Sequence, residues 1–575
     1  MQRIVDPRQT RLFDPFEAVL NETTRRRLED HWPGVFRHVI LQLMPVETLR
    51  QHFHPRLGRP TKELYSMAGL ILLMEFQDWT KEQAVNAYSF YMDVQYALNL
   101  EPVAHDLAVR SLERYLVYFE QDQLAQRVMH DVTTEMVTLL ALRIDQQRLD
   151  STHIFSDMAH FGRTRLLGVA LKRFLTQVKR HDPPAYAALP EALRQRYAPS
   201  DLRLFADTAR DRDSQHLLRR QVAEDLHQVL QLFADPSGHA QRSSYKAMER
   251  IFREQCEVQE QKVVLKAHAG SDVMQNPSDP DATYDGHKGP GYQAQIAETC
   301  HPDNEVQLIT CVLPQTAAVT DEKALAPVLE DLQASGLLPE ELLVDTLYPS
   351  DENVQQAEAM GVELVGPVPG AAPVQRPEDL TIDDFVVDEA TECVTRCPDG
   401  QAPLRSVHDP ATGKTRTLMP AACCARCAYR DQCPVQETGD GYHLEHTAKQ
   451  RRMAGRRREQ QTDVFRQRYR RRSGIEGTNS GLKRRMGLRR LRVRGRARVF
   501  LAIYLKIAGW NILRAATCAT MRNLVQTRAR AAVLGLWTRL RTAVRAPQTS
   551  RLAPSAITGT SHGWFLPRSA LRQAA

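Results

Sequence analysis

The stretch GYQAQIAETCHPDNEVQLITCVL, residues 291–313, contains two apolar, β-prone runs on either side of a His-Pro-Asp-Asn sequence. Proline and Asp/Asn favour turns, so the stretch predicts a β-hairpin with strands at residues 291–300 and 305–313. Downstream, residues 321–335 have a helical pattern and residues 342–344 (LLV) form a short apolar strand. Ser350 can then cap a helix that Gly361 ends, and VELV (362–365) is a further strand. With QQRLDSTHIF (146–155) as an upstream strand, this order predicts an α/β fold, a mixed sheet with helices on its faces.

The rest of the chain divides into segments around this sheet. Residues 1–135 are predicted to be helical, with Thr80 and Gln83 as a capping box. They suit a helix-turn-helix-like DNA-binding or dimerisation domain, although a plain structural bundle is equally compatible. We expect a core formed by residues 140–365 and 449–520, with a helical insertion at about 157–270. Four prolines between Pro367 and Pro377 mark a linker at the start of a Cys-rich insertion at 367–448, and residues 521–575 are expected to form a basic, loosely ordered tail.

Positive charge is concentrated near the C-terminal end of the predicted core. Residues 449–514 hold 22 lysines and arginines against three acids, a net charge of +19. The whole chain carries +7, so the remainder is at −12. A concentrated basic segment indicates a polyanionic partner. Each phosphate that it neutralises should contribute about −0.9 to the slope of log K against log salt.

Composition and cysteine content limit the class of protein. A chain with 42% hydrophobic and 25% charged residues is ordinary for a soluble globular protein. Lys506, Asn511 and Arg514 interrupt the apolar stretch 499–521, which is therefore predicted to be a buried helix rather than a membrane span. The first residues lack the apolar core of a signal peptide, and ten cysteines in so long a chain do not suggest a disulfide scaffold. We expect a reducing, cytoplasmic location.

A motif within the basic segment combines groups of complementary chemistry. In YRRRSGIEGTNSGLK (469–483), Tyr469, Arg472, Glu476 and Lys483 fall within an arc of about 60° if the segment is one helix. A carboxylate can bind a divalent metal ion, and the cations and phenol can hold phosphate oxygens beside it. The motif therefore predicts metal-dependent chemistry on a nucleic-acid backbone, although a solvated basic helix with an incidental Glu476 remains the alternative.

Two further features indicate how this helix is anchored. Four apolar residues share one side of it: Val464, Ile475, Leu482 and Met486. Three glycines share another side: Gly474, Gly477 and Gly481. Each glycine costs a helix roughly 1 kcal/mol relative to alanine. Their clustering predicts the close approach of another backbone or of nucleic acid.

Asp150 and Asp345 are each expected to end an apolar strand, at the kind of sheet edge where α/β active sites lie. Together with Glu476 they could hold two Mg²⁺ or Mn²⁺ ions about 3.5–4 Å apart for phosphodiester chemistry. The alternative is structural, with Asp150 capping a turn through Ser151 and Thr152 and Asp345 marking a strand-to-helix junction.

These motifs resemble those of the DDE transposases of bacterial insertion sequences. Tyr469-RR-Arg472-SGI-Glu476-GTNSGL-Lys483 matches the Y-(2)-R-(3)-E-(6)-K signature of one large group at every spacing. RLDST around Asp150 and LLVDTLYPSDEN around Asp345 resemble the regions of the first and second catalytic aspartates. The N-terminal GRPTKELYSMAGLILLMEF resembles the helical domain of one subgroup, and the long insertion after Asp150 is a departure.

The resemblance implies a ribonuclease-H-like fold and the cutting and joining of DNA at terminal inverted repeats. It assigns metal binding to Asp150, Asp345 and Glu476, and contacts with DNA ends to Tyr469, Arg472 and Lys483. Arg489 and Arg490, which follow the signature, are further candidates for DNA contact. It also implies a homodimer on paired ends. A metal-dependent nuclease of the same fold and an inactive DNA-binding protein are the alternatives.

The Cys-rich insertion contains a possible metal site. Cys397, the Cys424-x-x-Cys427 pair and Cys433 could form a tetrahedral structural zinc site. Such a site can supply about 10–16 kcal/mol of apparent binding free energy, enough to order a small module. Cys393 and Cys423 could substitute for these ligands or be bystanders, and free thiols are the alternative.

Overall fold

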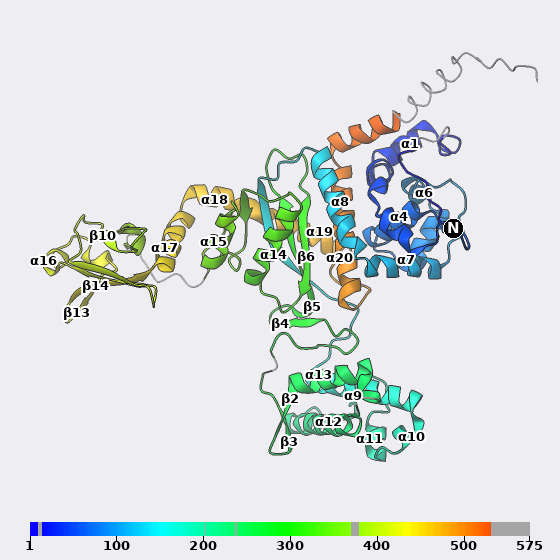
Figure 1. Cartoon of the computed structure of the whole chain (residues 1–575), viewed down its shortest axis with the longest axis horizontal. Helices are drawn as coiled ribbons and strands as arrows, with labels where there is room; N and C mark the ends of the chain where they lie inside the picture. The colour runs from blue at the N-terminus through cyan, green and yellow to red at the C-terminus, as the bar shows by residue number, and fades with distance from the viewer. Residues whose placement is uncertain (10–13, 202, 236–237, 269, 370–378, 531–575) are drawn as a thin grey trace, which may run out of the picture.

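The computed structural model describes residues 1–9, 14–201, 203–235, 238–268, 270–369 and 379–530. Pro373 and Pro377 of the predicted linker, and residues 531–575 of the predicted tail, lie outside these ranges. Figure 1 shows a central sheet with the N-terminal helices on one side, a helical insertion attached at one end, and a smaller β-rich unit beyond α17.

The central sheet is mixed, as the sequence predicts. Its strand order is β6-β5-β1-β7-β8, and the short β4 also pairs with β5. β1 is antiparallel to β5 and β5 to β6, whereas β1, β7 and β8 are parallel. The bounds are β1 (Gln146–Ile154), β4 (Thr283–Asp285), β5 (Gly289–Thr299), β6 (Ile309–Thr316), β7 (Glu341–Leu343) and β8 (Glu363–Val365).

Local sequence signals account for the connections in this sheet. The hairpin predicted from residues 291–313 is β5–β6, closed by a bond from the Asn304 amide to the His301 carbonyl. Helix α14 (Asp321–Ala334) follows it. Ser350 caps α15 (Asp351–Ala359) by accepting from the Asn353 amide, and Gly361 follows the helix with φ +78°. These three predictions are confirmed.

The N-terminal helices are short and are joined by tight turns. Thr80 and Gln83 form the predicted capping box at the start of α5. The helices are α1 (Glu22–Glu29), α2 (Trp32–Val35), α3 (Val46–Leu49), α4 (Leu64–Phe76), α5 (Lys81–Phe90), α6 (Met92–Ala97), α7 (Val109–Gln121) and α8 (Leu124–Leu139). Their buried side chains belong to the same hydrophobic cluster as the sheet, so they share a core with it.

Two insertions have hydrophobic clusters of their own. The first holds α9 (Arg163–His181), α10 (Pro183–Ala187), α11 (Glu191–Arg196), α12 (Arg212–Leu232), α13 (Ser243–Gln255), β2 (Cys256–Gln259) and β3 (Lys262–Leu265). The second holds β9 (Val386–Val387), β10 (Val394–Arg396), β11 (Arg405–Asp409), β12 (Lys414–Met419), α16 (Ala421–Cys424), β13 (Gln436–Thr438) and β14 (Gly441–Thr447).

The chain then returns to the sheet. It forms α17 (Ala448–Gln460), α18 (Asp463–Tyr469), a 3-10 segment (Arg470–Ser473), α19 (Gly474–Arg485) and α20 (Arg496–Ala516). Residues 519–530 are also helical, with Met521 and Val525 fully buried. The prediction of a loosely ordered tail from residue 521 is therefore wrong for residues 521–530, because these two side chains, four positions apart, pack into the core.

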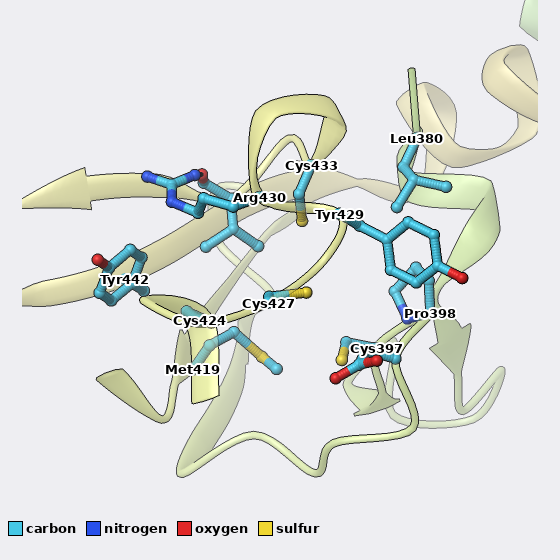
Figure 2. A pocket seen from close by; sticks show the side chains of 12 residues that line it. Leu380, Cys397, Pro398, Met419, Cys424, Cys427, Tyr429, Arg430, Cys433 and Tyr442 are labelled. Atoms are coloured by element: carbon cyan, nitrogen blue, oxygen red, sulfur yellow. Dashed lines mark hydrogen bonds between the residues drawn. The ribbon is translucent and has the colours of Figure 1, made fainter. Parts of the chain in front are cut away.

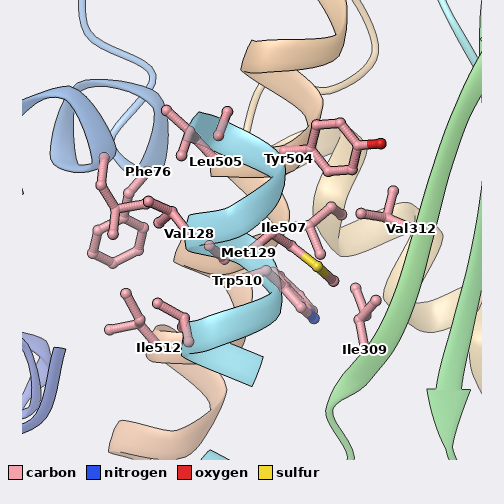
Figure 3. Close-up of a cluster of buried hydrophobic side chains, with 14 of the residues drawn as sticks. Phe76, Val128, Met129, Ile309, Val312, Tyr504, Leu505, Ile507, Trp510 and Ile512 are labelled. Carbon is pink, nitrogen blue, oxygen red and sulfur yellow. The ribbon is translucent and has the colours of Figure 1, made fainter. Parts of the chain in front are cut away.

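Helix α20 connects the N-terminal helices to the sheet. Figure 3 shows it beside α8, with Phe76 of α4 on one side and Ile309 and Val312 of β6 on the other. Its length and composition would suit a membrane span, but 78% of its most apolar 18-residue window is buried. The prediction of a buried helix is confirmed.

Two of the three polar residues that interrupt α20, Lys506 and Asn511, have partners on other elements. The Lys506 ammonium lies 2.8 Å from Asp78 Oδ1 and 3.4 Å from Glu75 Oε2, although Lys506 itself is only 2% exposed. Asn511 accepts from the Ile309 amide and donates to the Ile309 carbonyl, so it pairs both backbone groups at the start of β6. Lys506 and Asn511 thus each pair with polar groups of another element, which an apolar residue could not do.

Candidate active site

The three acids singled out in the sequence converge on one guanidinium group. Arg472 Nη2 lies 3.1 Å from Asp150 Oδ1 and 3.6 Å from Asp345 Oδ2, and Arg472 Nη1 lies 3.5 Å from Glu476 Oε1. The acids are far apart in the chain, and the sheet and α19 bring them together. Burial increases from Glu476, whose side chain is 68% exposed, to Asp150 at 19%.

Asp150 does not end its strand, contrary to the prediction. It lies within β1, which continues to Ile154, and Ser151 and Thr152 are also strand residues, so the turn-capping alternative is wrong. The parallel pairing of β1 with β7 covers only Gln146–Arg148. Asp150 therefore lies just beyond the carboxyl end of β7, where β1 has lost one neighbour and that side of the strand is open.

Asp345 lies in the loop between β7 and α15, as its position at a strand-to-helix junction predicts. Its Oδ1 accepts from the Thr346 amide at 2.8 Å, and its carbonyl accepts from the Tyr348 amide. Continuing the β1–β7 register by two residues would set Asp345 beside Asp150. The two aspartates are thus neighbours because their strands are parallel and adjacent.

The sequence predicts one helix for the segment that carries the motif. The structure instead divides this segment into α18, a 3-10 segment and α19. The tighter 3-10 winding changes the phase between the two helices. Ile475, Leu482 and Met486 are buried as predicted, whereas Val464, in α18, is 67% exposed. The predicted apolar side therefore holds only for α19.

Two of the three glycines of α19 make room for side chains rather than for a backbone. A methyl group at Gly474 would overlap the Arg148 guanidinium, and one at Gly481 would overlap the Trp510 ring. A methyl group at Gly477 would meet no described atom within 4 Å. Only Gly477 therefore leaves the helix surface open, on the side where a ligand could approach closely.

A buried network that the sequence analysis missed holds α19 against the sheet. Arg148 Nε donates to Glu298 Oε2 at 2.8 Å, and the hydroxyl of Thr478 donates to Glu298 Oε1 at 2.7 Å. Arg148 Nη1 also donates to the carbonyl of Arg471, before α19 begins. Glu298 is 1% exposed. A lone acid in the apolar strand QAQIAETC was the sequence signal for a buried partner.

Asn479 is a second residue that the analysis missed. Its Nδ2 donates to Asp150 Oδ2 at 3.1 Å, and its buried Oδ1 has no hydrogen-bond partner among the described atoms. It lies three residues after Glu476, so helical spacing could have identified it. On the other side of Asp150, Ser151 Oγ donates to Asp321 Oδ2 and lies 3.3 Å from Lys288 Nζ, which adds another acid and another cation nearby.

Burial shifts the pKa values of these groups. It raises the pKa of Asp150, and the Arg472 guanidinium opposes the shift. Burial also raises the pKa of Tyr469, whose ring stacks on Phe465. The pKa of Lys483 is lowered by burial and by the nearby Lys288 ammonium. A desolvated carboxylate surrounded by cations interacts strongly with any further charge that enters the site.

The residues predicted to contact DNA differ in position and in exposure. Tyr469 and Lys483 are partly buried, whereas Arg489 and Arg490 are exposed. The Phe155 amide donates to the Arg489 carbonyl and the Leu491 amide to the Phe155 carbonyl, which fixes this loop at the end of β1.

The basic segment is only partly available to a ligand. Eleven of its 22 lysines and arginines form ion pairs with acids among the described residues: Lys449, Arg451, Arg452, Arg458, Arg466, Arg468, Arg472, Arg492, Arg494, Arg498 and Lys506. Part of the positive charge of this segment is therefore used in ion pairs within the fold, and only the unpaired part can bind a polyanion.

A groove of about 960 Å³ lies between α1, α19 and α20. Four arginines line it together with Trp32 and Trp510: Arg27, Arg485, Arg514 and Arg522. None of the four forms an ion pair with a described residue, whereas Arg25 and Arg26 of α1 are paired with glutamates. Asp30 and Asp93 also line the groove, so four arginines and two aspartates give its lining a net charge of +2 beside the aromatic rings.

The four predicted zinc ligands line one small cavity of about 30 Å³ in the Cys-rich unit (Figure 2). Burial and the neighbouring cysteines raise the pKa of Cys424 to about 11. As their side chains are placed, no three His, Cys, Asp or Glu residues in the described part of the chain have the geometry to hold a metal ion. This applies to the cysteines and to the three acids around Arg472.

Comparison with known proteins bears on this site. Residues 396–516 match the family model of the transposase DDE domain. The match includes the four cysteines of the cavity, the motif from Tyr469 to Lys483 and α20, but neither Asp150 nor Asp345. It supports a DDE transposase, an enzyme class that acts on DNA. No curated protein and no solved structure matched the chain.

Proposed function

We propose that the chain is a DDE-type DNA transposase that cuts and joins DNA at the inverted-repeat ends of an insertion sequence. The observation that carries the proposal is the convergence of Asp150, Asp345 and Glu476 on one guanidinium. The match of residues 396–516 to a transposase DDE domain supports the same function.

The strand order supports a ribonuclease-H-like fold for the core. Three antiparallel strands, β6, β5 and β1, continue into the parallel β7 and β8, and Asp150 lies in the first strand at the centre of this order. The residues implied as the metal triad then come from the central strand, its parallel neighbour and the helix α19 that packs against β1.

The residues at this site suit hard divalent cations. Three carboxylates meet where one cationic group now lies, and the buried Asn479 Oδ1 beside them lacks a partner among the described atoms. Oxygen ligands of this kind favour Mg²⁺ or Mn²⁺. Two such ions held by Asp150, Asp345 and Glu476 would lower the pKa of the attacking water or 3′-hydroxyl and stabilise the leaving oxygen.

The other side chains would hold and orient the DNA. Arg472 can exchange its carboxylates for phosphate oxygens, which a planar guanidinium can bind in a bidentate manner. Lys483 and the hydroxyl of Tyr469 lie beside the same acids and can bind neighbouring phosphates. Arg489 and Arg490 at the end of β1 extend this surface, and the groove lined by Arg485 and Arg514 would take DNA farther from the cleavage point.

Further parts of the proposal concern the assembly. The N-terminal helices would contribute DNA binding or dimerisation, and two chains would act together on paired ends. The protein would act in the bacterial cytoplasm.

The test is Mg²⁺-dependent strand transfer with DNA that carries the element's ends. The wild-type chain should cleave and join, and Asp345→Ala should abolish both activities while it retains DNA binding. Cleavage without joining would favour a nuclease of the same fold. Binding without cleavage, in Mg²⁺ and in Mn²⁺, would overturn the enzyme proposal and favour a DNA-binding protein.

A further inference from the structure

We propose that Cys397, Cys424, Cys427 and Cys433 bind one structural Zn²⁺ ion, which holds together the unit formed by residues 379–447. This site lies outside the proposed DNA chemistry, and the inference does not depend on the transposase proposal.

The fold brings together four cysteines from two separate stretches of sequence. Cys397 follows β10, whereas Cys424 ends α16, and Cys427 and Cys433 lie between α16 and β13. All four line the same cavity, and the sulfur atoms of Cys397, Cys427 and Cys433 face one another across it (Figure 2). Tight turns present them: the Gly400 amide donates to the Cys397 carbonyl, and the Cys427 amide to the Cys424 carbonyl.

Other cysteines of this unit act as an internal contrast. The Cys393 thiol donates to the Ser406 carbonyl, and the Cys423 thiol donates to Gln401 Oε1. Neither lines the cavity. The unit therefore divides its six cysteines into four that share a cavity and two with separate hydrogen-bond partners.

The unit needs a cross-link because its own core is small. Its hydrophobic cluster has seven buried members: Ile382, Phe385, Val394, Met419, Val435, Tyr442 and Leu444. The strands β9, β10, β11 and β13 are short, and many of their residues are exposed. Units of this size with so little buried apolar surface usually depend on disulfides or a metal ion. In the described chain all ten cysteines are free thiols, which leaves the metal.

The chemistry of the cavity selects zinc. Four thiolates are soft ligands that favour tetrahedral Zn²⁺ or an iron–sulfur cluster, not Mg²⁺. Both fit four cysteines, and the small volume of the cavity, about 30 Å³, favours a single Zn²⁺ ion over a cluster of several iron and sulfide atoms, which the measured iron content tests.

Binding requires a local rearrangement. The thiols must turn inward to reach Zn–S distances of about 2.3 Å, and each thiol gives its proton to solvent as it becomes a thiolate ligand. Rotation about χ1 between staggered positions moves a sulfur without moving the backbone. The turns that carry the cysteines can therefore stay in place.

The experiment measures the metal content of the purified full-length chain by mass spectrometry, together with its iron content. We expect about one zinc per chain in the wild type and its loss in Cys427→Ser and Cys433→Ser. The matched variants Cys393→Ser and Cys423→Ser should keep the metal. Zinc retained in the first pair, zinc lost equally in all four variants, or iron in place of zinc would overturn the proposal.

A second measurement covers the case in which the first pair fails to fold. The wild-type chain, stripped of metal under reducing conditions, is titrated with Co²⁺. Tetrahedral thiolate coordination gives visible absorption bands that Zn²⁺ then displaces in a 1:1 ratio. Absence of these bands, or of displacement, would overturn the proposal. Neither measurement uses strand transfer, so its result is independent of whether the chain is a transposase.

Discussion

Arg472 neutralises the carboxylates of the candidate active site. Its side chain is only 13% exposed and meets three acids, of which Asp150 is the most buried. Three carboxylates at such separations would repel one another strongly in a partly desolvated site without a cation among them. The guanidinium therefore lies where a divalent cation would gain the most from the same acids, and the two kinds of cation compete for them.

This competition predicts the effect of Arg472→Ala on metal affinity. Mn²⁺ should bind about tenfold more tightly to the variant, because the metal no longer has to displace the guanidinium, an effect equivalent to about 1.4 kcal/mol. Isothermal titration calorimetry measures this without turnover. Arg471→Ala is the control, since Arg471 bonds to Gln146 and not to the three acids. Equal or weaker Mn²⁺ binding to Arg472→Ala would contradict the competition.

Asp150 predicts a dependence of stability on pH. Burial raises its pKa above the unfolded value of 3.8, so the native state holds the proton more tightly than the unfolded chain does. The protonated, neutral form of Asp150 therefore stabilises the native state below pH 3.8. This stabilisation is lost as the pH rises through the pKa of Asp150 in the folded protein. Asp150→Asn, which stays neutral, should therefore raise the melting temperature at pH 7 by roughly 1–3 °C, and this gain should shrink toward pH 4.

Asp351 is a control of opposite sign for that measurement. The hydrogen bond from Arg452 lowers the pKa of Asp351, so its stabilising contribution is present above the unfolded pKa and is lost as the pH falls. Asp351→Asn should lower the melting temperature at neutral pH. If both variants shifted it in the same direction at pH 7, burial would not be the cause of the Asp150 effect.

At the scale of the element, α19 is held in position by side chains of β1, β5 and α20. Thr478 and Glu298 hold it to β5, Arg148 holds the turn before it, and the missing side chain of Gly481 lets Trp510 of α20 lie against it. Glu476 is thus set relative to Asp150 by contacts made on other sides of the helix. A substitution on one of those sides should displace Glu476, although the substituted residue does not contact this acid.

The glycines of α19 give a matched pair of variants. Gly477→Ala should stabilise the protein by up to about 1 kcal/mol, because alanine favours a helix and its methyl group meets no described atom within 4 Å. Gly481→Ala should destabilise it by about 1–3 kcal/mol, because the methyl group overlaps the Trp510 ring. Urea unfolding of both variants measures these changes. Destabilisation by both would mean that the open side of α19 is in fact covered.

At the scale of the whole molecule, α20 joins the N-terminal helices and the sheet into one core. The buried Lys506 pairs with Glu75 and Asp78 at the end of α4, and Asn511 completes the backbone pairing of β6. The proposed DNA surface, which combines residues of α1, α19 and α20, therefore depends on this packing.

The free arginines of the groove predict how DNA binding responds to salt. Because 11 of the 22 basic residues in 449–514 are already paired, we expect this segment to contribute a slope no steeper than about −10 to log K against log salt. The double variant Arg485→Ala/Arg514→Ala should reduce the slope by about 2. Arg25→Ala/Arg26→Ala, on the neighbouring α1, should leave it unchanged. Fluorescence anisotropy over a salt series measures both, and equal effects would exclude the groove as a DNA surface.

Local sequence by itself determined the elements of this protein. The hairpin, the capping box at Thr80, the Ser350 cap and the burial of α20 were predictable because each depends on residues close together in the chain. The spacing of Tyr469, Arg472, Glu476 and Lys483 was visible for the same reason. The break of that segment at Arg470–Ser473 was not, because a 3-10 turn and an α-turn share much of their local sequence preference.

Only the tertiary structure decided which groups meet. Asp150 lies within β1 because the antiparallel pairing with β5 continues to Ile154, whereas the pairing with β7 ends at Arg148. The centring of Arg472 among three acids follows from the sheet and α19 together. The same is true of Glu298 with Arg148 and of the four cysteines around one cavity. These contacts join residues more than a hundred positions apart or in separate turns, and short-range periodicity carries no information about them.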